Sequence, residues 1–424
     1  MRSLSLFLYN LLFAPILAVL LPGYLLRIKR RGGYSHKAAQ RFGILSQEEL
    51  ERIGTGRIWL HAVSVGEVGI ALKFATQFRK RHPEARFLVS STTSTGLAIL
   101  ERSASEWLEP MANPIDLPII TARLVKRLRP SALLMVEADL WPNRIAACRR
   151  MKIPVGLINA RLSMRSERRF RWVRPLSASF FNQLDLITLT DPEDEARWIS
   201  LGVNPALLRL TGNIKHDSAG NANSSNSRSE NPILLAASTH AGEEREIATA
   251  WLGLKKEFPN LRLVITPRHV ERRGEIRAAL RDLGITCGLR SEGASLSENP
   301  LLLDTTGELS GWYSQATLVF VGKSLPCAIN KGGQNMVEPL QAGAPVLIGP
   351  HTGNFEPLAT HLCDGGAAIR IKTSEELVAA ARIILADEAK RSVMVAAARE
   401  VLQPHQGATA RNCEFVEALL KTRI

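Results

Sequence analysis

Two short segments of this chain place carboxylates where they can act in proton transfer. The segment SVGE at residues 64–67 puts Glu67 in the first turn of a predicted helix, directly after an apolar strand. Burial raises the pKa of a carboxyl group toward neutrality, where it serves well as a general base. Glu67 is therefore a candidate base, although the helix dipole alone also favours a carboxylate at a helix start.

A second pair of carboxylates, Glu137 and Asp139, directly follows the apolar run at residues 132–136. Charges at the end of a buried strand are costly unless they are paired or functional. We expect one of the two to bind a basic group or to stabilise a site. Asp139 has an alternative role, which is to cap the helix that follows it.

Basic side chains follow other predicted strands. Arg161 comes just after residues 155–159, where it can bind an anion or lie unengaged at the surface. Lys215 precedes a Ser- and Asn-rich stretch at a predicted domain junction, where a cation can neutralise a leaving phosphate or a substrate carboxylate. Arg268 ends the run at residues 262–266 with a guanidinium.

A glycine pair, Gly332 and Gly333, stands before another predicted helix. Glycines at a helix start can expose backbone N–H groups to a phosphate. Glu338, inside that helix, can accept hydrogen bonds from ribose hydroxyls. The pair alone is typical of many turns, and it gains weight only as part of the series of strand-end motifs.

These residues follow apolar runs that alternate with helical patterns. The first series of runs lies at residues 57–63, 85–90, 132–136, 155–159 and 186–189. The second lies at residues 233–237, 262–266, 301–304, 318–321 and 345–348. A helix is expected at residues 68–81, and the chain is helical in pattern from residue 375 onward. Such alternation predicts βαβ units, parallel sheets and an α/β fold class.

The two series predict two doubly wound, Rossmann-like domains. We expect an N-terminal domain at residues 32–217, a linker or loop at 218–232 and a C-terminal domain at 233–424, whose last helices can return to the N-terminal domain. Such sheets bind ligands at the carboxyl ends of their strands. The candidate residues are therefore expected to line a cleft.

Several enzyme classes are not supported by the sequence. It contains no GxGxxG, no GxxxxGK[ST], no HExxH and no GxSxG. Nicotinamide dinucleotides, P-loop ATPases, zinc proteases and serine hydrolases of those types are therefore not indicated. We expect neither a metal nor a cofactor.

Charge and composition indicate an anionic partner in a reducing compartment. The net charge is +14, with 54 Lys and Arg against 40 Asp and Glu. Aromatic residues make up only 6%, and no basic run is interleaved with stacking aromatics, which argues against nucleic acid. Five scattered cysteines form no CxxC pair and predict no disulfide framework.

The N-terminal residues 1–31 are predicted to be a membrane anchor and its basic flank. Residues 4–26 are nearly all apolar and carry no charge, which is about the length that crosses a bilayer. Four basic residues follow within 27–31, against Arg2 alone before the run, so the remainder is expected in the cytoplasm. A cleaved signal peptide fits less well because no small-residue cleavage site follows. A tilted or half-inserted helix also fits, and anionic headgroups suit the basic flank.

Taken in order, these segments resemble the 3-deoxy-D-manno-octulosonic acid (Kdo) transferases of lipopolysaccharide assembly. The matching motifs are HAVSVGE at 61–67, EADLWPN at 137–143, NARLS at 159–163, TGNIK at 211–215, TPRH at 266–269, GGQNMVEP at 332–339 and GPHTGNF at 349–355. The resemblance spans nearly the whole chain. Each motif is modest by itself, whereas seven in order are highly specific.

The resemblance implies a GT-B fold, with CMP-Kdo as the donor substrate and a lipid A precursor (lipid IVA) as the acceptor. It implies that Glu67 is the general base and that Glu137 and Lys215 stabilise the transition state. By the same resemblance, residues 32–217 bind the acceptor and residues 233–424 bind the nucleotide sugar. The residues that resemble CMP-binding segments are Pro267, Arg268, Gly307, Glu308, Leu309, Asn335, Met336, Val337 and Glu338.

One motif departs from the family pattern. The family usually has Glu-Thr-Glu or Glu-Ser-Glu before Leu-Trp-Pro, whereas this chain has Glu137-Ala138-Asp139. The first carboxylate is kept, so the family role goes to Glu137, and the role of Asp139 stays open. The family also commonly has a longer, glycine-containing stretch in place of residues 327–331.

The expected reaction is an inverting displacement at the cytoplasmic face of a bacterial inner membrane. Arg268 and the helix start at residues 333–338, headed by Gly333, are expected to hold the CMP phosphate. Lys215 offsets the leaving charge, and Glu67 takes the proton of the attacking hydroxyl. The alternatives are a transferase that uses a UDP-sugar and a non-catalytic membrane protein that binds anionic lipid.

Overall fold

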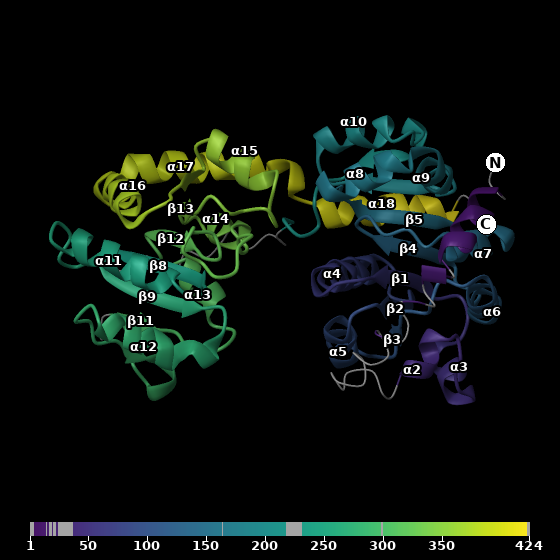
Figure 1. Cartoon of the computed structure of the whole chain (residues 1–424), viewed down its shortest axis with the longest axis horizontal. Coiled ribbons are helices and arrows are strands. Elements are labelled where there is room, and N and C mark those ends of the chain that lie inside the picture. The colour runs from purple at the N-terminus through teal and green to yellow at the C-terminus, as the bar shows by residue number, and fades with distance from the viewer. Residues whose placement is uncertain are drawn as a thin grey trace. The chain divides into compact units, whose positions relative to one another are not determined.

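The computed structural model describes residues 4–13, 15–16, 19, 23, 37–162, 164–217, 231–297 and 300–421. The chain divides into two compact units, of which the first combines Met1–Asp217 with His405–Ile424 and the second is Ser218–Pro404 (Figure 1). Most of the predicted linker at residues 218–232 lies outside the described residues.

The first unit is built on a parallel sheet of seven strands in the order β3-β2-β1-β4-β5-β6-β7 within the described residues. Its strands are β1 (Ile58–Ala62), β2 (Phe87–Ser91), β3 (Leu108–Ala112), β4 (Ala132–Val136), β5 (Val155–Ala160), β6 (Leu186–Leu189) and β7 (Leu208–Leu210). Its helices are α2 (Ala38–Arg41), α3 (Gln47–Ile53), α4 (Val65–Arg81), α5 (Ser94–Arg102), α6 (Pro118–Leu128), α7 (Pro142–Arg150), α8 (Met164–Trp172), α9 (Arg174–Phe181), α10 (Pro192–Ser200) and α18 (Ala408–Lys421).

The second unit repeats the plan, with the sheet order β10-β11-β9-β8-β12-β13-β14 over its described part. Its strands are β8 (Ile233–Thr239), β9 (Arg262–Pro267), β10 (Gly288–Leu289), β11 (Leu301–Leu302), β12 (Leu318–Val321), β13 (Val346–Ile348) and β14 (Ala368–Arg370). Its helices are α11 (Glu243–Lys255), α12 (Arg273–Arg281), α13 (Leu309–Tyr313), α14 (Val337–Gln341), α15 (Leu358–Asp364), α16 (Ser374–Ala386) and α17 (Glu388–Leu402). The expectation of two parallel-sheet α/β domains is thereby confirmed.

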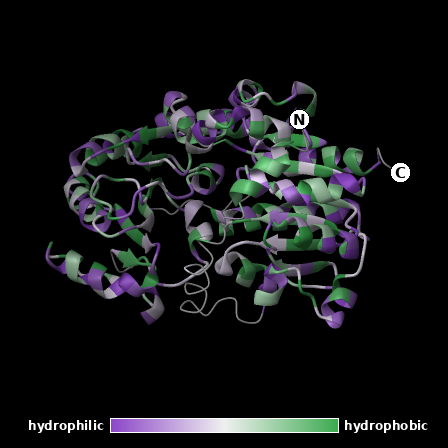
Figure 2. Ribbon diagram, turned by 45° about the vertical axis from the view of Figure 1, so that its right-hand side comes forward, coloured by the Kyte–Doolittle hydropathy of each residue, from purple (hydrophilic) through white to green (hydrophobic). Residues whose placement is uncertain are grey.

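Both faces of the first sheet are covered, which explains its apolar strands. Along β1, Ile58 and Leu60 pack into one core cluster with α4, whereas Trp59 packs into the cluster on the other face. Hydropathy colouring shows mostly hydrophobic residues along the strands (Figure 2). The helices carry both hydrophilic and hydrophobic residues along their length. Because neighbouring strands of the sheet are all parallel, their carboxyl ends meet along one side of the sheet, its carboxyl edge.

Two strands of the first sheet were not predicted, and both lie at its edges. The strand β3 has the sequence LEPMA, in which Glu109 and Pro110 hide the apolar pattern. An edge strand tolerates proline because one side of it donates no hydrogen bonds to a neighbour. The opposite edge strand, β7, has only three residues, of which two are exposed.

The last helix belongs to the first unit. The helix α18 packs against α4, β5 and β6, where Val416 joins their core cluster (Figure 1). The Asp217 carboxylate accepts hydrogen bonds from the backbone N–H groups of Gly407 (2.8 Å) and Thr409 (2.7 Å). Arg81, at the end of α4, pairs with Glu417 at 2.9 Å. The chain thus returns to the unit in which it began.

Helical residues at the N-terminus contact the first unit through one face. The Tyr9 hydroxyl donates to Asp116 (3.2 Å), and the Asn10 and Asn143 side chains exchange hydrogen bonds of 3.0 and 2.8 Å. Large apolar side chains of the same stretch are exposed, namely Leu4, Phe7, Leu8, Leu11, Leu12, Ile16 and Val19. This stretch is therefore amphipathic in its packing.

The predicted anchor at residues 4–26 lies partly outside the described residues, as do the basic residues that follow it. Among the helices that the structure describes, none combines the length and apolar character needed to cross a membrane.

Candidate active site

Glu67 lies in the first turn of α4, directly after β1. Its carboxylate accepts hydrogen bonds from the backbone N–H of Val63 (2.7 Å) and from the Ser64 hydroxyl (2.9 Å). Ser64 caps the helix, so the two side chains form a reciprocal arrangement like a capping box. The side chain is only 7% exposed. The helix-start role expected as an alternative is therefore present, and it also holds the carboxylate in one place.

Burial and neighbouring carboxylates raise the pKa of Glu67. Desolvation is the largest cause, and the negative charges of Asp139 and Glu137 act in the same direction. The hydrogen bonds from Val63 and Ser64 oppose this rise without cancelling it. A carboxyl group with a raised pKa is a stronger proton acceptor once it is ionised, as a general base requires.

Asp139 contacts Glu67 and does not cap its own helix. Burial raises the pKa of Asp139 as well, and a hydrogen bond to the Glu67 side chain opposes that rise. The expected alternative, in which Asp139 caps the next helix, is wrong. At the start of α7 the N-cap is Trp141, whose side chain makes no capping bond. The backbone N–H groups of that turn donate instead to Asp116, which comes from the connection after β3.

Glu137 and Lys215 form an ion pair at the carboxyl ends of the strands, on the same side of the sheet as Glu67. The Lys215 ammonium lies 2.6 Å from the Glu137 carboxylate, and the side chains are 35% and 23% exposed. A Cβ placed on Gly66 would lie 3.5 Å from the Lys215 nitrogen, so this ammonium adjoins the turn that carries Glu67. The structure thus brings together Glu67, Asp139, Glu137 and Lys215, which come from three separate connections.

Glu137 has a strained backbone in this cluster. Its φ is 63°, in the left-handed region that non-glycine residues rarely adopt. Such conformations persist where surrounding contacts over-determine them, and they gather at functional sites. The Glu137 N–H is held by the Ile158 carbonyl of the neighbouring strand at 3.1 Å.

Sequence reasoning missed Asn159, which holds the segment that carries Lys215. Its side-chain oxygen accepts from the Ile214 N–H (2.7 Å), and its amide nitrogen donates to the Asn213 side chain (3.3 Å). Asn213 in turn accepts from the Lys215 N–H at 3.0 Å. Asn159 is fully buried and also has a left-handed φ, of 53°. Its presence in the NARLS motif at a strand end was the available signal.

Arg161 is not an unengaged surface residue. It is half-buried, and its positive charge favours the ionised form of Asp194 and the neutral form of His216. For both groups the largest effect is burial, which raises the pKa of Asp194 and lowers that of His216. Arg161 therefore lies close enough to Asp194 and His216 to act on both of them electrostatically.

In the second unit, the predicted nucleotide segments lie after β9, β11 and β12. Pro267 ends β9, and the Arg268 N–H donates to the Thr239 carbonyl at 3.0 Å, so the Arg268 side chain stands at the sheet edge. Arg268 is exposed. A guanidinium in this place suits a phosphate or carboxylate group.

The other two nucleotide segments lie at the starts of two helices that pack together. Gly307 has a φ of 92°, and Glu308 accepts from Thr305 (2.6 Å) and Arg290 (3.0 Å) before α13 starts at Leu309. The helix α13 packs on α14.

Asn335 and Glu338 are hydrogen-bonded to each other at the start of α14. The Asn335 amide donates to Glu338 at 2.7 Å, and its oxygen accepts from the Val337 N–H at 3.0 Å. Met336 and Val337 are buried in the hydrophobic core of the second unit and therefore fix the position of this segment. Glu338 is exposed, as a group that binds hydroxyls must be.

The expected role of the glycine pair is contradicted. The backbone N–H groups of Gly332 and Gly333 both donate to the Lys323 carbonyl, at 3.1 and 2.9 Å. They are therefore not turned toward a phosphate. The physical reason is that the segment with the two glycines folds back on the start of the connection after β12, where the Lys323 carbonyl accepts their hydrogen bonds. The helix α14 starts only at Val337.

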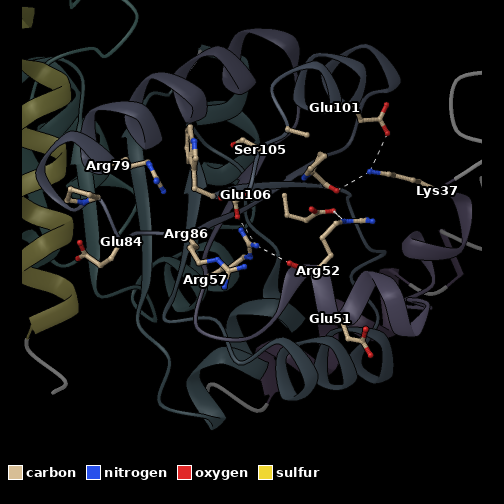
Figure 3. Close-up of a pocket in the computed structure, with 15 residues that line it drawn as sticks. Lys37, Glu51, Arg52, Arg57, Arg79, Glu84, Arg86, Glu101, Ser105 and Glu106 are labelled. Atoms are coloured by element: carbon tan, nitrogen blue, oxygen red, sulfur yellow. Dashed lines mark hydrogen bonds and ion pairs between the residues drawn. The ribbon is translucent and has the colours of Figure 1, made fainter.

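A cavity of about 960 Å³ lies elsewhere on the first unit (Figure 3). Its lining includes Arg57, Arg86 and Trp107, which precede β1, β2 and β3, so it opens at the amino ends of these strands. Some of its charged lining residues pair with one another, as do Arg52 with Glu109 at 2.8 Å and Lys37 with Glu101 at 3.3 Å. None of the predicted site residues lines it, and the candidate active site stays at the opposite edge.

The sequence matches the model of the 3-deoxy-D-manno-octulosonic-acid transferase (kdotransferase) family over residues 36–218. The 3-deoxy-D-manno-octulosonic acid transferase of Chlamydophila psittaci is 32% identical to it over 383 residues, which are 86% of this chain and 85% of that protein.

Two solved structures share the fold at low identity. A putative UDP-N-acetylglucosamine 2-epimerase from Listeria monocytogenes has a TM-score of 0.59 at 14% identity, covering 88% of this chain and 98% of its own. A glycosyltransferase from Rickettsia africae has a TM-score of 0.55 at 10% identity, covering 87% and 99%. At such identities the likeness concerns the fold alone.

Proposed function

Because this chain belongs to the 3-deoxy-D-manno-octulosonic acid (Kdo) transferase family, we propose that it transfers Kdo from CMP-Kdo to a hydroxyl of a lipid A precursor. The chain is a Kdo glycosyltransferase, and its two parallel-sheet units resemble those of GT-B enzymes. The observation that carries the site assignment is the cluster of Glu67, Asp139, Glu137 and Lys215 at one sheet edge.

The proposed reaction is a single displacement with inversion. The acceptor hydroxyl oxygen forms a bond to the anomeric carbon of Kdo, and the bond from that carbon to the CMP phosphate oxygen breaks. The electron pair of the broken bond leaves on CMP, and the hydroxyl proton passes to the Glu67 carboxylate. The raised pKa of the Glu67 carboxyl group supports this assignment, because a general base works best when its pKa is near the working pH.

Glu137 and Lys215 are assigned to stabilise charge in the transition state. The sugar becomes oxocarbenium-like and positive as the bond breaks, and the leaving phosphate gains negative charge. In the preformed ion pair, the Glu137 carboxylate can stabilise the positive sugar and the Lys215 ammonium can stabilise the negative phosphate, without reorganisation. Asn159 supports this role indirectly, because it fixes the backbone from which Lys215 projects.

The nucleotide sugar is assigned to the second unit. We propose that Pro267 and Arg268 bind the CMP phosphate and that the segments at Gly307–Leu309 and Asn335–Glu338 bind its nucleoside part. The exposed guanidinium of Arg268 and the exposed carboxylate of Glu338 support this assignment. No metal takes part in the proposed mechanism, because side chains supply the neutralising charge.

We propose that the protein acts at the cytoplasmic face of a bacterial inner membrane, to which its N-terminal segment attaches it. The exposed apolar side chains among residues 4–19 support this, since Tyr9 and Asn10 use the other face to hold the first unit. A helix with such a division can lie in the interface and bring the enzyme to a lipid acceptor and to anionic headgroups.

The test is incubation of the purified full chain with CMP-Kdo and a lipid A precursor, followed by mass spectrometry of the lipid. We expect a mass increase equal to one or more Kdo residues, with competition by CMP and not by UDP. Transfer from a UDP-sugar, or lipid binding without turnover, would contradict the proposal. Glu67→Ala, which should abolish transfer in a folded protein, serves as the negative control.

A further inference from the structure

Basic or imidazole side chains come one or two residues after the ends of three neighbouring strands of the second sheet. In the order β9-β8-β12, the residues that follow these strands are Arg268, His240 and Lys323. The strands are parallel and in register, with Ala237 of β8 opposite both Thr266 and Val321. The three side chains are therefore attached at one edge of the sheet.

A buried carboxylate ties the connections after β8 and β12 together. Glu243, which is fully buried, accepts from the backbone N–H groups of His240 (2.8 Å) and Lys323 (2.7 Å). Its other oxygen accepts from the N–H groups of Ser324 (2.9 Å) and Leu325 (3.0 Å). Four donors from two loops converge on one side chain, so the loops cannot shift independently.

Lys323 is held in an unusual backbone conformation by these contacts. Its φ is 62°, in the left-handed region, and its carbonyl accepts both Gly332 and Gly333 N–H groups. A Cβ at the preceding Gly322 would lie 2.5 Å from the Ser238 carbonyl oxygen, so the connection after β12 passes very close to the end of β8. Strain of this kind persists when the surrounding structure over-determines it and is typical of functional positions.

Two cations at this carboxyl end of the sheet are not held in ion pairs with any described residue. Arg272 is paired with Glu244 at 2.8 Å and with Glu275 at 3.1 Å. Within the part of the chain that the structure describes, neither Lys323 nor Arg268 makes an ion pair with a carboxylate. Among the described residues, two cations without an ion-pair partner thus stand on either side of the strand that leads to His240.

His240 lies between these cations and is uncharged at neutral pH. Burial lowers its pKa to about 4, and the charges of Lys323 and Arg268 act in the same direction. Its Nε2 lies 3.2 Å from the Gln334 side-chain amide, and its ring meets that of His269 edge-on at 5.8 Å. A neutral imidazole beside two cations leaves their charge available to an anion.

We propose that Lys323 binds an oxyanion of the nucleotide-sugar donor beside Arg268, and that Glu243 is the positioning residue that holds Lys323 there. This inference rests on the proposed function. The donor carries two anionic groups, the phosphate of CMP and the carboxylate of the sugar acid. Either oxyanion matches a lysine ammonium, and the experiment separates the two.

The experiment compares Lys323→Ala with Lys331→Ala, which removes an exposed lysine from the same connection. The KM for CMP-Kdo and the inhibition constant of CMP are measured for both, with a fixed lipid acceptor. We expect Lys323→Ala to raise the KM roughly 10- to 100-fold, as for a charged hydrogen bond, and Lys331→Ala to stay within about twofold of the parent.

The CMP measurement identifies the anion. If Lys323→Ala weakens CMP and CMP-Kdo alike, Lys323 binds the phosphate; if it weakens only CMP-Kdo, it binds the sugar carboxylate. An unchanged KM in a protein that still transfers Kdo would overturn the inference and leave the proposed function standing. A parental chain that neither binds nor turns over CMP-Kdo would overturn both.

The positioning role is tested by a double-mutant cycle. Glu243→Gln keeps the size of the side chain but replaces one acceptor oxygen with a donor that faces backbone N–H groups. We expect it to raise the KM for CMP-Kdo in the parent and to add little in the Lys323→Ala background. Fully additive effects on KM would contradict the positioning role. If Glu243→Gln does not fold, Glu243→Asp replaces it in the same cycle.

Discussion

The Lys215 ammonium lies 2.6 Å from the Glu137 carboxylate, although 78 residues separate them in the chain. Glu137 follows the central strand β4, and Lys215 follows the edge strand β7, with β5 and β6 between them in the sheet. The pair exists because Asn159, at the end of the strand beside β4, fixes the segment that carries Lys215. Charge of both signs is thus held beside the turn that carries Glu67.

Replacement of Lys215 by alanine should slow transfer without unfolding the protein. The side chain is partly exposed, so its loss leaves no deeply buried charge. We expect kcat to fall roughly 100- to 1,000-fold, as when one preorganised charge-stabilising group is removed. Steady-state kinetics with CMP-Kdo measure this, and Lys80→Ala on the exposed face of α4 is the matched control. Equal activity of the two variants would refute the role of Lys215.

Replacement of Glu67 by glutamine should remove the base and keep its hydrogen bonds partly intact. The glutamine oxygen can still accept from Val63 or Ser64, so α4 should start at the same residue. We expect transfer to fall roughly 100- to 10,000-fold with a nearly unchanged KM for CMP-Kdo. Circular dichroism checks the fold. A glutamine variant that transfers at the parental rate would exclude Glu67 as the base.

The Asp139→Asn variant should shift the pH dependence of transfer. A general base acts when ionised, so the rate of the parent rises with pH through the pKa of Glu67. Burial is the largest cause of the raised pKa of Glu67, and the negative charge of Asp139 is the next. Removal of that charge should therefore lower the pKa of Glu67. The acidic limb of the kcat profile should therefore move to lower pH. A limb that stays in place, or moves to higher pH, would show that the two carboxyl groups are not coupled.

Asn159 should act through Lys215. Asn159→Asp keeps an acceptor for the Ile214 N–H but loses the donor to Asn213, whereas Asn159→Ala loses both. We therefore expect alanine to lower kcat more than aspartate. Combining Asn159→Ala with Lys215→Ala should cost little more than Lys215→Ala alone, since both act on one group. Additive losses in kcat would mean that Asn159 affects transfer independently of Lys215.

Transfer should not require a divalent metal. The proposed mechanism assigns the neutralising charge to Lys215 and Arg268, so we expect the rate to be unchanged after incubation with EDTA. The comparison is made at constant ionic strength, because salt screens exposed charges. A loss of activity that Mg²⁺ or Mn²⁺ restores would contradict this mechanism.

Central strands could be predicted from the sequence, and edge strands could not. Residues 132–136 and 318–321 form β4 and β12 within the predicted bounds, because strands buried on both faces are continuous apolar runs. The edge strand β3 contains Glu109 and Pro110, which only an edge position tolerates. Its existence depends on what lies beside it, and local patterning does not encode that.

The sequence by itself determined which chemical groups stand at the strand ends, including Glu67, Glu137 and Lys215. Tertiary structure alone decided their partners. Asp139 bonds to Glu67 while Asp116 caps α7 in its place, and the Lys323 carbonyl takes the glycine N–H groups that were expected to face a phosphate. The reason is physical: the end of a strand follows from local periodicity, whereas a hydrogen-bond partner is supplied by segments that only folding brings close.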